Sequence, residues 1–406
     1  MQLLIKNNIF RILSLSKFLS SAGSYIYNIV FIIYAKSMPA PNVAVFVANI
    51  ATIIPTLLTF WVGVKADKSK NKKELLILIG FIQAILFVLV AITISNKTFL
   101  VFSTVCLINI ISDILTDYTN SLRMPIMQKN ISKEDLFEAY SFTQFLSYIA
   151  SILGQTFGVW LLTNSNNNFS LIAIVNGISF LLSSILILQN KKILSYDTVT
   201  ENEGSISLIK QFKKMFEMMT KIFEEIDDSS SFLKILISIL LLNSLGAAIH
   251  SIYTFYFLKH QFLNISYGNS LVIIEIITIT GAILGNLTPN DYFSKFSISQ
   301  LIFTQSISFT LVGLFNTIGF PFLGMLTLVL AAYIMGKVSP KLDAFIMEKL
   351  PSNMLAQSNN FLGLLFTVSL PIGISLFSFL ALYNIVLCWI IFSLISMVSL
   401  VTVYSK

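Results

Sequence analysis

Apolar segments long enough to cross a membrane follow one another along nearly the whole chain, and most lysines lie in every second gap between them. A helix needs roughly 20 predominantly apolar residues to cross the hydrocarbon of a bilayer. About twelve such segments are present, and each predicts a transmembrane helix. The predicted spans are 9–35, 43–64, 74–95, 98–122, 138–162, 169–189, 231–258, 268–288, 297–317, 319–338, 356–379 and 381–403.

The distribution of positive charge supports this assignment independently, because Lys and Arg in short loops are retained on the cytoplasmic side. With a cytoplasmic N-terminus, all but three of the 26 basic residues fall on the cytoplasmic side. The three on the outer side are Lys36, Lys97 and Lys259. A composition rich in Lys, Asn and Ile, with only Arg11 and Arg123 as arginines, is typical of an AT-rich bacterial genome. We therefore expect a multi-pass protein of the bacterial cell membrane with both termini cytoplasmic.

The composition excludes several classes of protein. Hydrophobic residues make up 55% of the chain and charged residues 11%, which leaves too little polar surface to coat a soluble globule. The net charge of +7 follows from the cytoplasmic lysines and gives no support to nucleic-acid binding. Neither a Walker loop nor a spacing of metal ligands is present. We expect no enzymatic activity, no cofactor and no metal.

One long polar stretch divides the chain in the middle. It predicts an N-terminal six-helix bundle at 1–189, a cytoplasmic linker at 190–230 and a C-terminal six-helix bundle at 231–406. Within the linker, apolar residues recur at helical spacing between lysines over 206–226, which is typical of an amphipathic helix on a membrane surface. An interfacial linker is the simpler interpretation of this helix, and a regulatory or partner-binding element is the alternative.

Acidic residues inside the spans need an explanation, because a carboxylate there costs at least about 2.5 kcal/mol on insertion scales. Asp113 and Asp117 lie one helical turn apart on the fourth span, and Glu275 lies within the eighth. We expect Asp113 and Glu275 to be candidates for proton coupling. Asp117 is expected in a structural pair near the cytoplasmic end, with Arg123 as its partner. His250 is interpreted as a core histidine in preference to a switch.

Polar residues also form stripes on several otherwise apolar spans. Such faces should point away from lipid. They predict a central water-filled cavity lined by Tyr27, Asn28, Gln144, Tyr148 and Asn243. The alternative is hydrogen bonding between helices, which needs no substrate.

The loop after the second span carries a recognisable signature. Residues 63–73 read Gly-Val-Lys-Ala-Asp-Lys-Ser-Lys-Asn-Lys-Lys, in which Gly63, Asp67, Lys68 and Lys72 match the pattern Gly-x-x-x-Asp-Arg/Lys-x-Gly-Arg/Lys-Arg/Lys. This resembles the signature loop of the major facilitator superfamily. The resemblance implies a fold of two six-helix bundles and makes these four residues a conformational latch. A sharp helix exit is expected at Gly63.

The matching loop of the second half, 285–289, keeps the glycine but has no acid at the matching position.

A looser resemblance covers most of the chain. Segments 125–148 and 370–373 are similar to macrolide-efflux proteins of the Mef type and to enterobactin exporters, which implies an exporter. On the fifth span Gln155 occupies a position where exporters usually have proline, but the small-residue spacing of Ala150, Gly154 and Gly158 still permits close helix packing.

Together these features predict a secondary active exporter of an amphipathic, drug-like or macrolide-like small molecule. It is expected to be proton-coupled, to work by alternating access and to be monomeric. Its expected partners are the substrate, protons and the lipid bilayer. The alternatives are an exporter of a specific peptide or siderophore, a nutrient importer on the same scaffold, and a membrane receptor that transports nothing.

Overall fold

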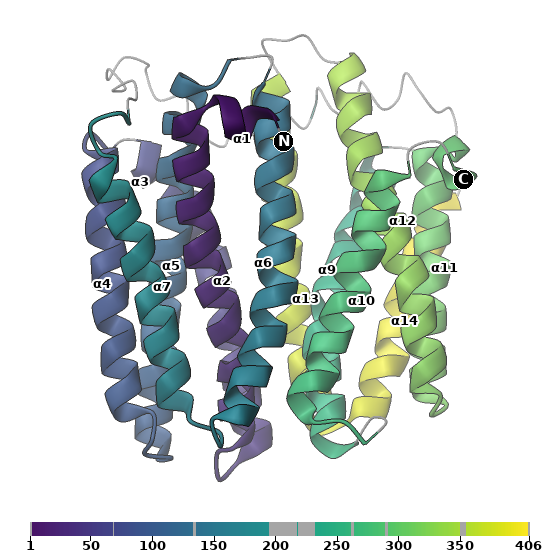
Figure 1. Cartoon of the computed structure of the whole chain (residues 1–406). Coiled ribbons are helices and arrows are strands. Elements are labelled where there is room, and N and C mark those ends of the chain that lie inside the picture. Colours follow the sequence, from purple (N-terminus) through teal and green to yellow (C-terminus); the bar gives the residue numbers. More distant parts are fainter. Residues whose placement is uncertain are drawn as a thin grey trace. The chain divides into compact units, whose positions relative to one another are not determined.

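The structure, a computed structural model, describes residues 2–67, 69–132, 135–194, 217, 232–260, 264–288, 291–349 and 355–404. Twelve helices of 20 to 32 residues account for most of these residues. They are α2 (Asn8–Lys36), α3 (Pro41–Asp67), α4 (Lys72–Thr93), α5 (Phe99–Asn130), α6 (Leu136–Asn164), α7 (Phe169–Gln189), α9 (Phe232–Lys259), α10 (Tyr267–Leu287), α11 (Ile298–Thr317), α12 (Pro321–Lys349), α13 (Leu355–Tyr383) and α14 (Ile385–Tyr404). A short helix α1 (Gln2–Lys6) precedes them, and a 3-10 turn η1 (Phe293–Lys295) precedes α11 (Figure 1).

Each predicted span corresponds to one of these helices, so the prediction of about twelve transmembrane helices is confirmed. Within the described residues, eleven helices are long and apolar enough to cross a membrane. The C-terminal part of α13, Val368–Tyr383, adds a shorter apolar helix. The chain is therefore an all-helical, multi-pass membrane protein.

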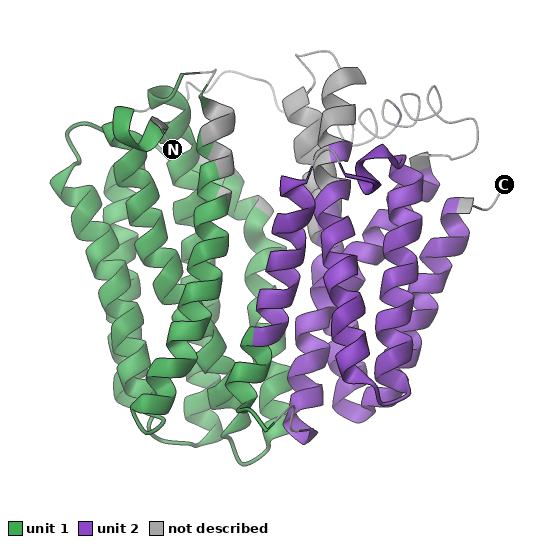
Figure 2. Ribbon diagram, turned by 45° about the vertical axis from the view of Figure 1, so that its right-hand side comes forward, with its two compact units in different colours: residues 1–201, 261–272 green, residues 202–260, 273–406 purple. Residues whose placement is uncertain are grey.

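Contacts along the chain define two compact units (Figure 2). Unit 1 contains residues 1–201 and 261–272, and unit 2 contains residues 202–260 and 273–406. The predicted bundles at 1–189 and 231–406 and the linker at 190–230 stay predictions. The predicted amphipathic helix at 206–226 lies outside the described residues, apart from Glu217.

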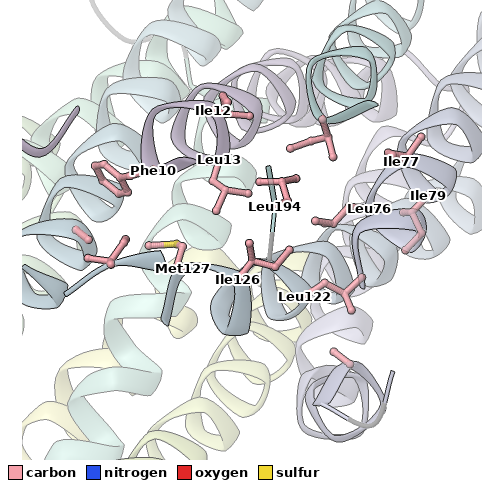
Figure 3. Packing of buried hydrophobic residues seen from close by; sticks show 14 of the residues in the cluster. Phe10, Ile12, Leu13, Leu76, Ile77, Ile79, Leu122, Ile126, Met127 and Leu194 are labelled. Atoms are coloured by element: carbon pink, nitrogen blue, oxygen red, sulfur yellow. The ribbon is translucent and has the colours of Figure 1, made fainter. Parts of the chain in front are cut away.

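In unit 1, α2 packs against α6 and α7, α4 packs against α7, and α3 packs against α5. A cluster of buried apolar side chains fills one end of these helices (Figure 3). Phe10 and Leu13 of α2 meet Leu76 of α4 and Ile126 of α5 there, and all four are at most 4% exposed. The cluster has members on each of the helices α1 to α7 and ties them together at the end where the polypeptide begins.

The contact between α2 and α6 depends on glycine. A Cβ atom added to Gly154 would lie 2.9 Å from the carbonyl oxygen of Ala22, and one added to Gly158 would lie 2.7 Å from that of Ile26. No larger side chain fits at either position without moving the backbone of α2. The small-residue spacing on this span, which permits close helix packing, is thus used for a close contact with α2.

In unit 2, α9 packs against α13 and α14, and α11 packs against α12 and α14. Glycines also bring α10 and α12 into backbone contact. Gly281 faces Ala332, with 2.7 Å between an added Cβ atom and the Ala332 Cβ atom. One turn further along, Gly285 faces the backbone of Tyr333, and Gly336 of α12 faces the backbone of Ala282. The Gly-x-x-x-Gly spacing on α10 thus fixes its position against α12.

Candidate functional site

Unit 2 brings an acid and a histidine together inside two apolar helices. Glu275 Oε2 of α10 lies 3.9 Å from His250 Nδ1 of α9, with side chains 23% and 36% exposed. At 1.5 Å per residue, Glu275 lies about 12 Å into a helix about 31 Å long, which is far from either end. His250 lies at a similar depth, about 14 Å before the end of α9. The two groups therefore form a titratable pair deep within the spans.

Asn243 lies on the same face of α9 as His250, because the two residues are seven positions, or about two turns, apart. Its side chain is partly exposed. The Thr254 hydroxyl is turned back to the backbone, where it donates a hydrogen bond of 2.7 Å to the carbonyl of His250. The face of α9 that carries the histidine thus presents polar side chains over two turns.

The pairing of His250 with Glu275 was missed by the sequence analysis, which assigned the histidine to the core. The sequence contains a signal for this pairing. Helices α9 and α10 are joined by a short connection, so they run antiparallel. His250 precedes the end of α9 by nine residues, and Glu275 follows the start of α10 by eight. Residues at equal distances from such a turn lie at the same depth.

In unit 1, Asp117 has a neutral partner. The Thr59 hydroxyl of α3 donates a hydrogen bond of 2.8 Å to Asp117 Oδ2. The expected partner, Arg123, contacts other groups: its guanidinium donates to Ser16 Oγ at 3.3 Å and to Asn120 Oδ1 at 3.2 Å. The predicted pair of Asp117 with Arg123 is wrong. Six residues on a helix turn the two side chains to different faces.

Asp113 lies one turn before Asp117 and one turn after Asn109, on the same side of α5. Asn109 is 1% exposed, and neither its amide oxygen nor its amide nitrogen has a hydrogen-bond partner among the described residues. A buried amide without a partner costs about 1–3 kcal/mol. Next to these groups, the amide of Gln83 on α4 donates to the Thr116 hydroxyl of α5 at 2.9 Å. Helix α5 thus carries polar groups over several turns inside unit 1.

The remaining predicted cavity residues differ in their surroundings. Tyr27 is 1% exposed, and its ring packs edge-on against Phe87 with 4.7 Å between the ring centroids. In this conformation Tyr27 belongs to the packed interior of unit 1. Asn28 and Tyr148 are partly exposed, and the side chain of Gln144 lies outside the described residues. Their roles in a cavity stay predictions.

The signature loop of unit 1 has a different shape from the one expected. Helix α3 continues through Gly63 and ends at Asp67, so the predicted helix exit at Gly63 is wrong. Beyond Asp67, the buried ammonium of Lys72 donates a hydrogen bond of 2.6 Å to the Ala66 carbonyl and so covers the C-terminal end of α3. The Asp67 side chain and Lys68 lie outside the described residues, and the latch role of the four residues stays a prediction.

The corresponding loop of unit 2 contains an acid after all, two residues beyond the position where the sequence pattern places it. Asp291 Oδ1 lies 3.0 Å from Lys337 Nζ of α12, and the Tyr333 hydroxyl donates to its other oxygen. Lys337 Nζ also donates to the Thr288 carbonyl at 2.6 Å. Desolvation acts to raise the pKa of Asp291, but hydrogen bonds from Ser294, Tyr333 and Lys337 outweigh it and hold that pKa well below its usual range.

The two loops share a feature that the signature does not describe. Asp291 follows Gly285 by six residues, and Ser69 follows Gly63 by six residues. Ser69 Oγ lies 2.6 Å from the hydroxyl of Tyr118 on α5, just as Asp291 meets a tyrosine of α12. In each unit a tyrosine hydroxyl therefore fixes the loop at the same offset from its glycine.

The length and apolar composition of the helices define the chain by class as a multi-pass membrane protein. The sequence profile of the Major Facilitator Superfamily matches residues 13–374, and the chain belongs to this superfamily. Membership indicates a transporter and not an enzyme. No curated protein sequence matches the chain.

Solved structures share the fold at low sequence identity. The nucleoside transporter NupG is 15% identical, with a TM-score of 0.67 over 98% of this chain and 100% of its own. A POT family transporter in complex with 5-aminolevulinic acid is 13% identical, with a TM-score of 0.66 over 97% of this chain and 96% of its own. The POT family transporter PepTSo is 11% identical, with a TM-score of 0.67 over 97% of this chain and 98% of its own.

Proposed function

We propose that the protein is a proton-coupled secondary active exporter of an amphipathic small molecule. It would act as a monomer in the bacterial cell membrane, with both termini cytoplasmic. The observation that carries the proposal is the pair of Glu275 and His250, 3.9 Å apart within the apolar helices α9 and α10. Asp, Glu and His inside membrane spans mark ion and substrate pathways and proton relays.

The pair is suited to coupling because protonation changes its charge. A carboxylate beside a neutral imidazole carries one negative charge, and uptake of one proton makes the pair neutral overall. A charged group costs several kcal/mol more than a neutral one in an apolar span. The proton would therefore change the relative free energies of two conformations of the transporter, and a substrate bound to one of them would be moved against its gradient.

Asp113 is proposed as a second coupling group, in unit 1. It lies on the face of α5 that carries Asn109, whose buried amide has no hydrogen-bond partner among the described residues. A carboxylate on such a face is positioned to exchange protons or to bind a polar group of the substrate. Asp117 is held by Thr59 and has a structural role in this proposal.

The export direction is supported by the resemblance of segments 125–148 and 370–373 to macrolide-efflux and enterobactin-exporter proteins. The spans are also rich in side chains that adapt to apolar cargo, since the chain contains 35 Phe, 14 Tyr and 12 Met residues. An amphipathic molecule would bind through such contacts, with polar groups fixing its orientation.

A second candidate function is the import of a small polar molecule. Asn243, His250 and Glu275 supply the fixed polar groups that such a substrate requires. The similarity to nucleoside and peptide transporters is consistent with this alternative. It differs from the proposal in the direction of movement and in the polarity of the substrate.

Transport in membrane vesicles of both orientations tests the proposal. Inverted and right-side-out vesicles would be supplied with a panel of fluorescent amphipathic compounds, nucleosides and short peptides, with and without an imposed proton gradient. The proposal predicts gradient-driven accumulation of an amphipathic compound in inverted vesicles, which is lost in Glu275→Gln or Asp113→Asn. Accumulation of a nucleoside or peptide in right-side-out vesicles would support the second candidate instead.

The control variant is Glu74→Gln. It makes the same chemical change in an ion pair at the surface, where Glu74 and Lys191 are 3.1 Å apart and both about 40% exposed. Surface pairs of this kind contribute about 0–1 kcal/mol, so this variant should transport like the wild type. Equal loss in both glutamate variants would contradict a specific role for Glu275.

A further inference from the structure

A cavity of about 330 Å³ is lined by residues at one end of the helices of unit 1. The end of α2 that contributes to it lies opposite the N-terminus (Figure 1). The connections after α2, α4 and α6 contribute to its lining, as do the residues at the start of α10. Residues 261–272 belong to unit 1, so the whole cavity lies within that unit. It contains none of the acids assigned to proton coupling.

The walls of the cavity combine apolar and polar groups. Ile33 of α2 and Val159 of α6 form part of its apolar lining, and the hydroxyl-bearing Ser37 and Thr163 lie beside them. The start of α10 closes one side at short range. A Cβ atom added to Gly268 would lie 2.7 Å from Ile33 Cδ1 and 3.0 Å from Val159 Cγ1.

Two lysines line this cavity, and no acid does. Lys36 ends α2 and holds its ammonium 4.2 Å from the centre of the Tyr267 ring, while Lys97 is exposed. The four connections at this end, 37–40, 94–98, 165–168 and 260–266, contain neither Asp nor Glu. Two of the three lysines expected on the outer side, Lys36 and Lys97, therefore line one cavity, and no carboxylate is among the described residues that line it.

Two helices also begin at this cavity. Phe169 is the first residue of α7 and Tyr267 the first of α10, and both line it. The N-terminal end of a helix carries the positive end of its dipole and favours anions. These partial charges add to the charges of the two lysines.

We propose that this cavity binds a phosphate-bearing anion, and that the bound species is the headgroup of an anionic phospholipid. The two lysines and the two helix N-termini supply the positive field that a phosphate requires. The apolar lining beside them suits the glycerol and the first methylene groups of a lipid. The cavity lies at the ends of membrane-spanning helices, where headgroups are found. A free phosphate anion shares the same recognition chemistry.

Thermal unfolding of the purified full chain in a neutral detergent tests this assignment. Dioleoylphosphatidylglycerol, dioleoylphosphatidylcholine and inorganic phosphate would each be titrated at constant ionic strength. Phosphatidylglycerol is expected to raise Tm in a saturable manner, since a ligand that binds only the folded state stabilises it. The apparent affinity should fall at least about tenfold in Lys36→Met and in Lys97→Met, which each remove one charge.

Lys259→Met is the matched control. Lys259 is an exposed lysine at the end of α9 that does not line the cavity, so its removal should leave the titration unchanged. Because Lys97 is exposed, its substitution disturbs no packing, and Lys97→Met remains informative if Lys36→Met fails to fold.

A rise in Tm with inorganic phosphate that is lost in the same two variants would support the site and make a soluble anion its ligand. The proposal is overturned if phosphatidylcholine raises Tm as much as phosphatidylglycerol does, or if neither phosphatidylglycerol nor phosphate raises it. A rise with phosphatidylglycerol that survives both lysine substitutions would also overturn it. None of these outcomes bears on proton-coupled transport.

Discussion

The titratable groups inside the two units differ in their partners. In unit 2, Glu275 lies 3.9 Å from an imidazole that can itself take up a proton. In unit 1, Asp117 accepts a hydrogen bond from the hydroxyl of Thr59, which does not titrate. The comparison suggests that an acid inside a span is not functional merely because of its depth. In the proposal above, a partner that can take up a proton is what distinguishes Glu275 from Asp117.

The largest effect is expected for Glu275→Gln. The substitution keeps the shape of the side chain and removes its ability to become negative. Gradient-driven transport should fall at least about 100-fold, which corresponds to about 2.7 kcal/mol. Energy-independent exchange of substrate should persist, because the fold and the binding groups remain. Initial rates of both processes in proteoliposomes would measure this, and retained gradient-driven transport would contradict it.

A smaller effect is expected for His250→Gln, which leaves the acid but removes the neighbouring titratable group. Transport should fall about tenfold, or about 1.4 kcal/mol, and its dependence on pH should change shape because one titrating group is lost. Rates measured between pH 5.5 and 8.5 would show this. A pH profile identical to that of the wild type would remove His250 from the coupling pair.

Asp117→Asn should have little effect on transport. The amide oxygen of asparagine can accept the hydrogen bond from the Thr59 hydroxyl, so the contact between α3 and α5 survives. We expect a change in rate of less than about twofold, which is under about 0.5 kcal/mol. A loss as large as that of Glu275→Gln would show that the partner does not distinguish the two acids.

The smallest effect on transport, with a distinct effect on stability, is expected for Asp291→Asn in the loop after α10. The pKa of Asp291 is lower in the folded chain than its ordinary value of 3.8, so its ionised form stabilises the fold above that pH. The stabilisation is lost as the pH falls below 3.8 toward the folded-state value. Tm of the wild type should therefore exceed that of Asp291→Asn at pH 6, and the difference should shrink at pH 3.

A pH-independent difference in Tm would show that the ion pair with Lys337 and the hydrogen bond from Tyr333 contribute nothing through the charge of Asp291. Ser69, at the same offset in unit 1, carries no charge. Ser69→Ala is the counterpart in that loop, and its effect on Tm should not change between these pH values.

The helices were predictable because a run of roughly 20 predominantly apolar residues is enough to indicate a membrane-spanning helix. Each predicted span matches a helix, and the spacing of Gly154 and Gly158 indicated that the fifth span could pack closely against another helix, which the structure identifies as α2. Both inferences use properties of one helix alone. They require no knowledge of how helices are rotated against one another.

The site was predicted less well, because it depends on that rotation. Glu275 was identified from the cost of a buried carboxylate, but its partner His250 was recognised only from the structure. The helix exit expected at Gly63 was wrong, since glycine permits a turn without requiring one and α3 continues to Asp67. Asp291 was overlooked because it lies two residues beyond the position that the signature specifies.

Proton movement driven by substrate tests the central claim most directly. Proteoliposomes containing a pH-sensitive dye would receive a transported compound without any imposed gradient, and the internal pH would be followed for the wild type, Glu275→Gln and Asp117→Asn. We predict that substrate entry drives protons in the opposite direction in the wild type and in Asp117→Asn, and drives none in Glu275→Gln. Proton movement of normal size in Glu275→Gln would contradict the assignment of the Glu275 and His250 pair as the coupling site.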